Sequence, residues 1–347
     1  MIKQKTAMIS GITGQDGGYL AKFLLGKGYR IIGLYRRGAT DTFTKLKEHG
    51  ILEQIELKDF DLLEFSNICR LLKNYQPDEF YNLAAQSFVA ASFEEPIYTT
   101  QADGMGVLHI LEAIREFSPH TKLYQASTSE MFGKVQEIPQ KETTPFYPRS
   151  PYGVAKLTAH WMCVNYRESF NVFAASGILF NHESPMRGDE FVTRKITKHF
   201  ARMLADETNL PVELGNLNAK RDWGFAGDYV EMMWLMLQQD KPDTYVIATG
   251  ETHSIREFCE EAGKVCGWDI EWSGENENET GIDRKTGKML VKVNPLFYRP
   301  AEVEILIGDP SKAEKELGWQ RKTDYKGLCR MMTEADIARM KIPAGVK

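Results

Sequence analysis

The sequence predicts an α/β fold in which helices cover both faces of a doubly wound parallel sheet, followed by a smaller mixed α/β lobe. Apolar runs of strand length alternate with segments of helical periodicity through the first half of the chain. The alternation loosens near residue 185, so we expect one lobe over 1–185 and a second over 186–347, with the chain crossing between them. Residues 274–288 are polar and contain glycine, and we expect a surface loop there.

Three glycines lie between the first expected strand and the first expected helix. Gly11, Gly14 and Gly17 are spaced three residues apart after an apolar run at 7–9. A pyrophosphate can rest on a helix N-terminus only where the backbone approaches closely, and Cβ atoms would block that approach. The sequence therefore predicts a Rossmann-type dinucleotide-binding turn.

The end of the second strand indicates which dinucleotide binds. The apolar run at 29–35 ends in Arg36 and Arg37, where an NAD site usually has an acidic residue for the ribose 2′-hydroxyl. Two guanidinium groups suit a 2′-phosphate, so the sequence favours NADP. The alternative is a solvated loop of arginines.

The composition argues against several classes of protein. The 347 residues carry a formal net charge of −5, which does not favour a nucleic-acid or acidic-membrane partner. No apolar run reaches the ~20 residues of a spanning helix, and the first strand leaves no room for a signal peptide. The five cysteines are scattered without a CxxC pair, so we expect a cytoplasmic enzyme without disulfides or a metal site.

A tyrosine and a lysine occur four residues apart in the next expected helix. This spacing places Tyr152 and Lys156 on one face of that helix. An ammonium group near a phenol stabilises the phenolate, which can act as general base on a sugar hydroxyl, and the lysine can also hydrogen-bond the nicotinamide ribose. Such a pair is common on surfaces, but here it follows both a dinucleotide turn and a Ser/Thr cluster at 127–129.

Together these motifs resemble the extended short-chain dehydrogenase/reductase superfamily and, more narrowly, the GDP-mannose 4,6-dehydratases. The resemblance covers nearly the whole chain, and its most specific stretches are 11–16, 127–133, 135–152, 180–185 and 221–224. It implies an NADP cofactor, a nucleotide-sugar substrate, and a homotetramer or homodimer in which the loop 36–39 reaches a neighbouring subunit.

The resemblance implies a catalytic set of Thr128, Glu130, Tyr152 and Lys156. Tyr152 would take the proton of the sugar 4-hydroxyl while hydride leaves C4. Glu130 would take the C5 proton, water would leave across C5 and C6, and the hydride would return to C6. Thr128 would hydrogen-bond the 4-oxygen. Two alternatives remain open: Glu130 could close a helix-capping box with Ser127, and Thr128 could merely satisfy a strand end.

Binding residues are implied for both the cofactor and the substrate. Those expected beside the cofactor are Gly11, Thr13, Gly14, Gln15, Asp16, Gly17, Arg36, Arg37, Asp61, Leu62, Leu83, Ala84, Ala85, Ser87, Tyr98, Lys156, His182 and Arg187. Those expected beside the nucleotide sugar are Ser87, Asn181, Val192, Lys195, Arg221, Arg299 and Glu302.

Blander interpretations of four of these residues remain open. Asp61 could cap the next helix, and His182 could be a structural histidine. Arg187 could be a loop charge, and Glu302 could pair with Arg299 instead of binding guanine.

Three positions depart from the family pattern. Met186 stands where the family usually has arginine, Phe225 where it has histidine, and Gly227 where lysine is common. The sugar is therefore left open, and a GDP-manno-heptose is the alternative substrate. A non-catalytic NADP-sensing protein of the same fold is the alternative from another class, against which the intact catalytic set argues.

Overall fold

The computed structural model describes residues 4–297 and 305–340. The chain folds into two compact units. Unit 1 comprises Met1–Phe180, Ala226–Thr249 and Gly308–Gln320, and unit 2 comprises Asn181–Phe225, Gly250–Ile307 and Arg321–Lys347. The division falls after Phe180, whereas the sequence places it near residue 185. Segments far apart in the sequence thus complete each unit.

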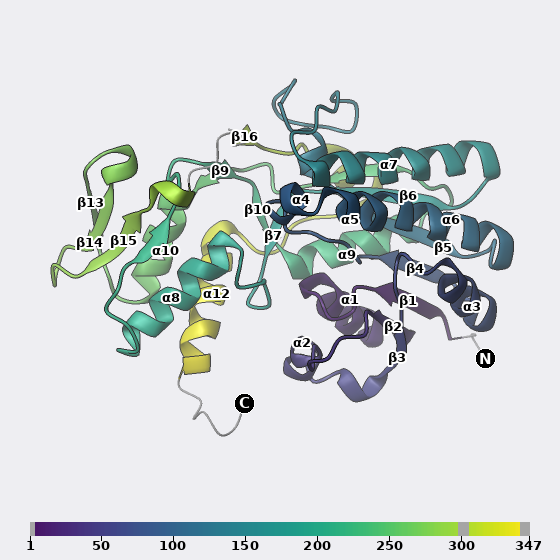
Figure 1. Ribbon diagram of the computed structural model, residues 1–347, viewed down its shortest axis with the longest axis horizontal. Helices are drawn as coiled ribbons and strands as arrows, with labels where there is room; N and C mark the ends of the chain where they lie inside the picture. Colours follow the sequence, from purple (N-terminus) through teal and green to yellow (C-terminus); the bar gives the residue numbers. More distant parts are fainter. Residues whose placement is uncertain (1–3, 298–304, 341–347) are drawn as a thin grey trace. The chain divides into compact units, whose positions relative to one another are not determined.

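The central sheet of unit 1 is parallel throughout its described strands (Figure 1). Its seven strands have the order β11-β6-β5-β4-β1-β2-β3. Their bounds are β1 Thr6–Ser10, β2 Arg30–Tyr35, β3 Ile55–Asp59, β4 Glu79–Asn82, β5 Lys122–Thr128, β6 Ala174–Leu179 and β11 Thr244–Ile247. This order reverses between β1 and β4, as in Rossmann-type folds, and confirms the predicted fold class.

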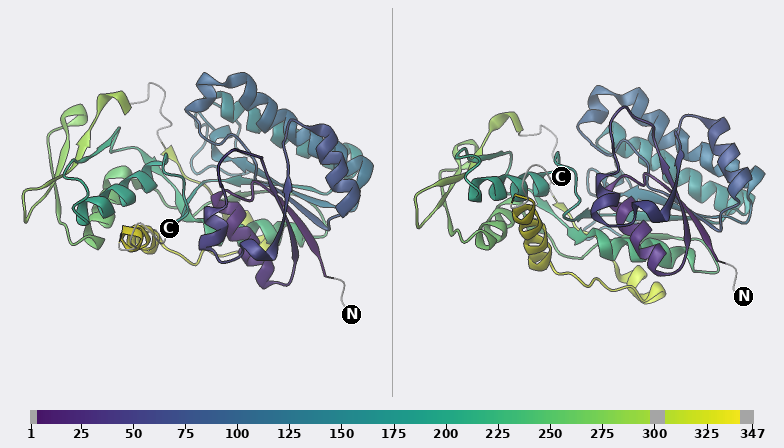
Figure 2. Two further views of the ribbon diagram at one scale, coloured as in Figure 1. Left: turned by 60° about the horizontal axis from the view of Figure 1, so that its bottom comes forward. Right: turned by 90° about the horizontal axis from the view of Figure 1, so that it is seen from below.

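Helices cover both faces of this sheet (Figures 1 and 2). They are α1 Gln15–Gly26, α2 Thr44–Glu48, α3 Phe65–Tyr75, α4 Ala91–Glu94, α5 Pro96–Thr100, α6 Gly106–Phe117, α7 Pro151–Phe170, α9 Ala226–Leu237 and α11 Ser311–Leu317. Successive side chains of a strand point to opposite faces. Ala7 and Ile9 therefore lie in the apolar cluster of α1 and α9, and Met8 lies in that of α3, α6 and α7.

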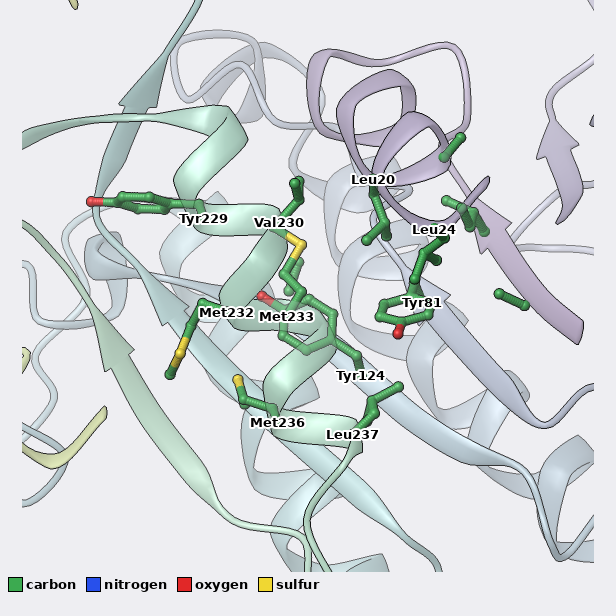
Figure 3. Packing of buried hydrophobic residues seen from close by; sticks show 14 of the residues in the cluster. Leu20, Leu24, Tyr81, Tyr124, Tyr229, Val230, Met232, Met233, Met236 and Leu237 are labelled. Carbon is green, nitrogen blue, oxygen red and sulfur yellow. The ribbon is translucent and has the colours of Figure 1, made fainter. Parts of the chain in front are cut away.

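The core between α1 and α9 joins two segments that are far apart in the sequence. In Figure 3, Leu20 and Leu24 from α1 and Met233 from α9 lie around Tyr81 and Tyr124 of the sheet. All five side chains are completely buried. Helix α9 thus supplies part of the layer that covers the first strands of the chain.

Unit 2 contains three small sheets and three helices within the described residues. The first sheet pairs β10 with β7. The second has the order β12-β9-β16, and the third has the order β13-β14-β15-β8. The strands are β7 Asn181–Glu183, β8 Val212–Leu214, β9 Lys220–Arg221, β10 Trp223–Phe225, β12 His253–Ser254, β13 Ile270–Ser273, β14 Thr280–Asp283, β15 Met289–Val293 and β16 Ile305–Leu306. The helices are α8 Val192–Leu204, α10 Ile255–Val265 and α12 Tyr325–Met340.

The expectation of a surface loop over 274–288 is wrong for the middle of the segment. Strand β14 runs through the segment and pairs antiparallel with β13 and β15. Position 281 of this strand is a glycine, and a Cβ atom there would approach the Trp272 ring to 2.8 Å. Asp283, which is buried, accepts bonds from the N–H groups of Asp269 and Thr286. Polar residues that satisfy each other locally therefore look like a loop in the sequence.

None of the helices described between residues 4 and 340 is long and apolar enough to cross a bilayer. In the same part of the chain, no three His, Cys, Asp or Glu side chains are grouped as metal ligands would be.

We expect Leu24→Ala to lower the free energy of unfolding by about 2–5 kcal/mol, because it empties a fully buried site that α9 covers. Urea denaturation followed by circular dichroism measures this loss. The control, Leu210→Ala, truncates a side chain that is 73% exposed and should change the free energy by less than about 0.5 kcal/mol. Equal losses in both variants would contradict the packing of α1 against α9.

Candidate active site

The glycine turn between β1 and α1 brings three stretches of backbone together. Gly11 has φ +69°, and a Cβ atom on it would lie 2.9 Å from the Ala84 nitrogen. A Cβ atom on Gly17 would lie 2.5 Å from the Gly11 oxygen. Gly14 is the N-cap of α1 and brings no side chain over the N–H groups of its first turn. The turn therefore fits a pyrophosphate at the helix N-terminus.

Ser10 fixes the neighbouring segment, although its role was not predicted from the sequence. Its buried hydroxyl donates to Asn82 Oδ1 at 2.6 Å. It accepts the N–H groups of Leu83 and Ala84 at 3.1 and 3.2 Å. One serine thus holds the start of the 83–87 segment beside the glycine turn. Its position one residue before Gly11 was the available signal.

Two of the residues expected to contact the cofactor meet at the end of β2. The Arg36 guanidinium donates to the Tyr98 hydroxyl and lies 5.9 Å from the centroid of that ring. Arg37 is exposed beside it. Tyr98 comes from α5, so a tyrosine far along the chain orients the first of the two arginines.

Asp61 and Leu62 lie just after strand β3. Asp61 does not cap α3, whose N-cap is Glu64; its Oδ1 accepts the Leu63 N–H at 2.9 Å in a local turn. The Leu62 side chain is buried against Gly106 in the core, so a Cβ atom on that glycine would lie 2.8 Å from Leu62 Cβ. Any direct contact of Leu62 with a cofactor therefore comes from its backbone.

Strand β5 ends at two of the expected catalytic residues. Thr128 is the N-cap of a short 3-10 turn, η3 (Ser129–Met131), and its hydroxyl accepts the Glu130 N–H at 3.2 Å. A hydroxyl that accepts one bond can still donate its proton. The Ser127 hydroxyl bonds the Ser176 hydroxyl at 2.8 Å instead, so Ser127 and Glu130 do not form a capping box. That alternative is wrong, because the cap of this turn is Thr128.

Helix α7 presents the tyrosine and lysine. Ser150 caps it by accepting the Gly153 N–H at 3.0 Å, and Pro151 occupies the first turn. Lys156 is 4% exposed, and its Nζ lies 5.8 Å from the centroid of the Tyr152 ring and donates to the Ala126 oxygen at 3.1 Å. Burial lowers the pKa of Lys156, and the Asp103 carboxylate opposes this.

Close backbone contact joins the first turn of α7 to η3. A Cβ atom on Gly153 would lie 2.8 Å from the Glu130 oxygen. Gly133, with φ +50°, passes still closer to the carbonyl of Tyr147, which accepts the Lys134 N–H at 2.9 Å. The structure thus holds the residues next to Glu130 and Tyr152 in direct contact. Tyr152 itself is 8% exposed.

Unit 2 holds most of the remaining expected residues. Asn181 begins β7 and pairs in register with Trp223, two residues after Arg221. His182 is buried in the same strand. Val192 begins α8, where it is partly buried against the core of unit 2.

Two cations of unit 2 have partners within that unit. The Arg187 Nε forms an ion pair with Glu183 Oε2 at 3.1 Å, and its guanidinium lies 3.5 Å from the centroid of the Phe191 ring. Lys195 Nζ donates to the backbone carbonyl of Glu213 at 2.6 Å. Burial lowers the pKa of Lys195. Arg187 is therefore a charge in the loop after β7, as the alternative had it, but one that is paired with Glu183. Arg299 and Glu302 lie outside the described residues.

Comparison with known proteins extends these observations. The model of the GDP-mannose 4,6 dehydratase family matches residues 8–332. The chain is 50% identical to the GDP-mannose 4,6 dehydratase of Dictyostelium discoideum, over 98% of both chains. It is also 50% identical to that of Homo sapiens, over 97% of this chain and 93% of the other.

Solved structures of lower identity share the fold. The Thermus thermophilus UDP-glucose 4-epimerase, in complex with NAD, is 23% identical, with a TM-score of 0.79 over 95% of this chain and 98% of the epimerase. The RMD of Pseudomonas aeruginosa, complexed with NADPH, is 20% identical, with a TM-score of 0.75 over 97% of this chain and all of the other.

A doubly wound sheet with a glycine turn after β1 and a Tyr–Lys pair on α7 defines the class of this protein as an extended short-chain dehydrogenase/reductase. Within that class the match spans most of the chain and the identities reach one half. The chain belongs to the GDP-mannose 4,6-dehydratase family.

We expect Gly17→Ala to weaken the binding of a nicotinamide dinucleotide, because its Cβ atom would displace the Gly11 carbonyl and widen the turn. Quenching of intrinsic fluorescence on titration with NADPH and NADH measures the dissociation constants. The matched control is Gly26→Ala, at the exposed end of the same helix, where a Cβ atom meets nothing within 4 Å. Unchanged binding in Gly17→Ala would contradict the assignment of the turn.

Proposed function

We propose that this chain converts GDP-mannose to GDP-4-keto-6-deoxymannose with NADP as a tightly held cofactor. The proposal rests above all on one observation: Gly153, the residue after Tyr152, packs directly on the backbone of Glu130, which supports a carboxylate acting together with the tyrosine–lysine pair. A simple dehydrogenase needs the pair but not the carboxylate. Identity of one half to GDP-mannose 4,6-dehydratases over nearly the full chain supports the same substrate.

The cofactor site would be formed by the glycine turn, the 83–87 segment, Arg36 and Lys156. The turn fits the pyrophosphate, and the Lys156 ammonium would hydrogen-bond the nicotinamide ribose. When bound, the nicotinamide supplies a reversible hydride acceptor, so the overall reaction consumes no reductant. His182 and Arg187 are further candidates for contacts with the cofactor.

Tyr152 would accept the proton of the sugar 4-hydroxyl as that carbon is oxidised. The nearby Lys156 ammonium favours the phenolate form that this step needs. Thr128 would donate its hydroxyl proton to the 4-oxygen, because its lone pair already accepts the Glu130 N–H. The tyrosine and threonine thus hold the same oxygen from β5 and α7.

Glu130 would perform the elimination. A 4-ketone acidifies the C5–H bond, and the carboxylate would take that proton to give the enolate, whose electrons form the C5–C6 double bond only as the C6–O bond breaks. The C6 hydroxyl leaves as water after receiving a proton from the same carboxyl group. Glu130 therefore ends in its starting ionisation state, and no external acid is consumed.

The nucleotide end of the substrate needs cations and polar groups. Unit 2 supplies Lys195 and Arg221 as candidates for the diphosphate. Asn181, at the start of β7, and Val192, at the start of α8, are further candidates from the same unit. Ser87 is the candidate from unit 1, and Arg299 and Glu302 remain candidates for the diphosphate and the guanine base. Met186 and Phe225 replace two polar residues of the family pattern, which favours a test of GDP-manno-heptose alongside GDP-mannose.

The same resemblance supports a homotetramer or homodimer in which the loop 36–39 contacts a neighbouring subunit. Arg36, oriented by Tyr98, would then bind the 2′-phosphate near that contact.

The purified protein should convert GDP-mannose to a 4-keto-6-deoxy product without any added reductant. Alkali treatment gives the ketone a near-ultraviolet absorbance, and mass spectrometry registers the loss of one water. Activity with GDP-manno-heptose alone would assign the substrate to the heptose. If the protein binds NADP but reacts with no nucleotide sugar, the result would favour the alternative of a non-catalytic NADP-sensing protein.

In this assay Glu130→Gln should retain NADP binding but lower kcat by about 100- to 10,000-fold, the usual contribution of a general base. Glu53→Gln, which changes an exposed carboxylate of unit 1, is the control and should keep full activity.

Arg36→Asp should weaken NADP binding by about tenfold or more while changing NAD binding little, because a charge-assisted hydrogen bond contributes about 1.5–3 kcal/mol. Isothermal titration with both dinucleotides gives the two dissociation constants. Lys73→Asp makes the same change in net charge on exposed α3 and serves as control. An equal loss for NADP and NAD would count against the 2′-phosphate assignment.

A further inference from the structure

A buried carboxylate lies beside the catalytic helix and has no role in the proposed chemistry. Asp103 is 1% exposed and belongs to a π-helical turn, η2 (Gln101–Met105), between α5 and α6. Turns of this kind inside α-helices are frequent at functional sites. A buried charge is costly unless it is paired, so Asp103 requires an explanation.

One oxygen of Asp103 has an evident partner. Its Oδ1 accepts the Gln86 N–H at 2.8 Å, which ties η2 to the 83–87 segment expected to hold the cofactor. The Gln86 side chain donates to the Thr99 hydroxyl at 3.2 Å and accepts the Phe88 N–H at 2.8 Å. The carboxylate therefore anchors the centre of that segment.

The turn that carries the other oxygen packs on α7. Oδ2 is buried and takes no hydrogen bond from the residues that the structure describes. The adjacent Gly104 packs on α7, where a Cβ atom would lie 3.4 Å from the Ala155 oxygen, one residue before Lys156. Burial lowers the pKa of Lys156 and raises that of Asp103 to about 6, and each charge opposes the shift of the other.

Few other titratable groups surround this pair. Among the described residues, Lys156 is affected by Asp103 and the Cys163 thiol, both from elements packed on or within α7, and Asp103 by Lys156 alone. Burial raises the pKa of Cys163 to about 12, so that thiol is neutral at working pH. Tyr152 is also titratable and lies beside the ammonium, and Glu130 lies on η3, whose backbone packs on the first turn of α7.

We propose that Asp103 is a positioning residue whose negative charge keeps the Lys156 ammonium protonated beside Tyr152 while its other oxygen fixes the 83–87 segment. A lysine that is 4% exposed would otherwise lose its proton at lower pH, and with it the charge that stabilises the phenolate. This inference rests on the proposed roles of Tyr152 and Lys156. It adds to them the group that maintains the ionisation state of the lysine.

The test is the pH dependence of kcat with GDP-mannose in the NADP-loaded protein. Asp103→Asn keeps an acceptor for the Gln86 N–H and removes only the charge. We expect the alkaline limb of its profile to move down by about one to two pH units. NADP affinity should stay at the wild-type value. Asp103→Ser should shift the limb in the same direction, and Asp103→Glu should restore its position even if kcat falls.

Cys163→Ala is the matched control, because it alters the other group near Lys156 without removing a charge, and its profile should match that of the wild type. Wild-type protein that binds NADP but does not turn over GDP-mannose would overturn the proposed function. An active wild type whose alkaline limb stays in place in the folded neutral variants would overturn this inference alone. So would failure of both neutral variants to fold, since Asp103 would then be purely structural.

Discussion

The arrangement of the site depends on one close contact between two backbones. The first turn of α7 lies on η3 so tightly that the residue after Tyr152 has no room for a side chain, since a Cβ atom there would meet the Glu130 carbonyl. That contact fixes the distance between the end of β5 and the start of α7. The side chains of Tyr152 and Glu130 are attached to the two backbones that this contact holds. A fixed spacing suits a reaction in which one proton is taken from the 4-hydroxyl and the next from the neighbouring C5.

Much of the fold could be predicted from the sequence because its signals are local. The apolar runs and the glycines at 11, 14 and 17 predict β1, β2 and the turn, since one short stretch of chain contains both the pattern and its cause. The segment 274–288 was misjudged for the opposite reason. Its strand is stabilised by pairing with β13 and β15, and this pairing does not show in the segment's own composition.

The candidate site divides in the same way. Tyr152 and Lys156 could be paired from their spacing alone, and Thr128 and Glu130 from a motif. Ser10 and Asp103 could not, because their partners lie about seventy residues away or across a helix contact. A carboxylate directly before the apolar periodicity of 106–117 was the available clue to Asp103. Its meaning depends on which helix packs against it.

The way in which unit 1 is divided along the chain affects how the protein is made. Strand β11 and helices α9 and α11 belong to this unit but come after residue 225. A fragment ending at Phe180 would leave the edge of β6 unpaired and the apolar side of α1 uncovered. On the ribosome the dinucleotide-binding unit therefore cannot be completed until the segment Gly308–Gln320 has been synthesised. Until α9 has been synthesised, the apolar side of α1 that packs against it stays exposed.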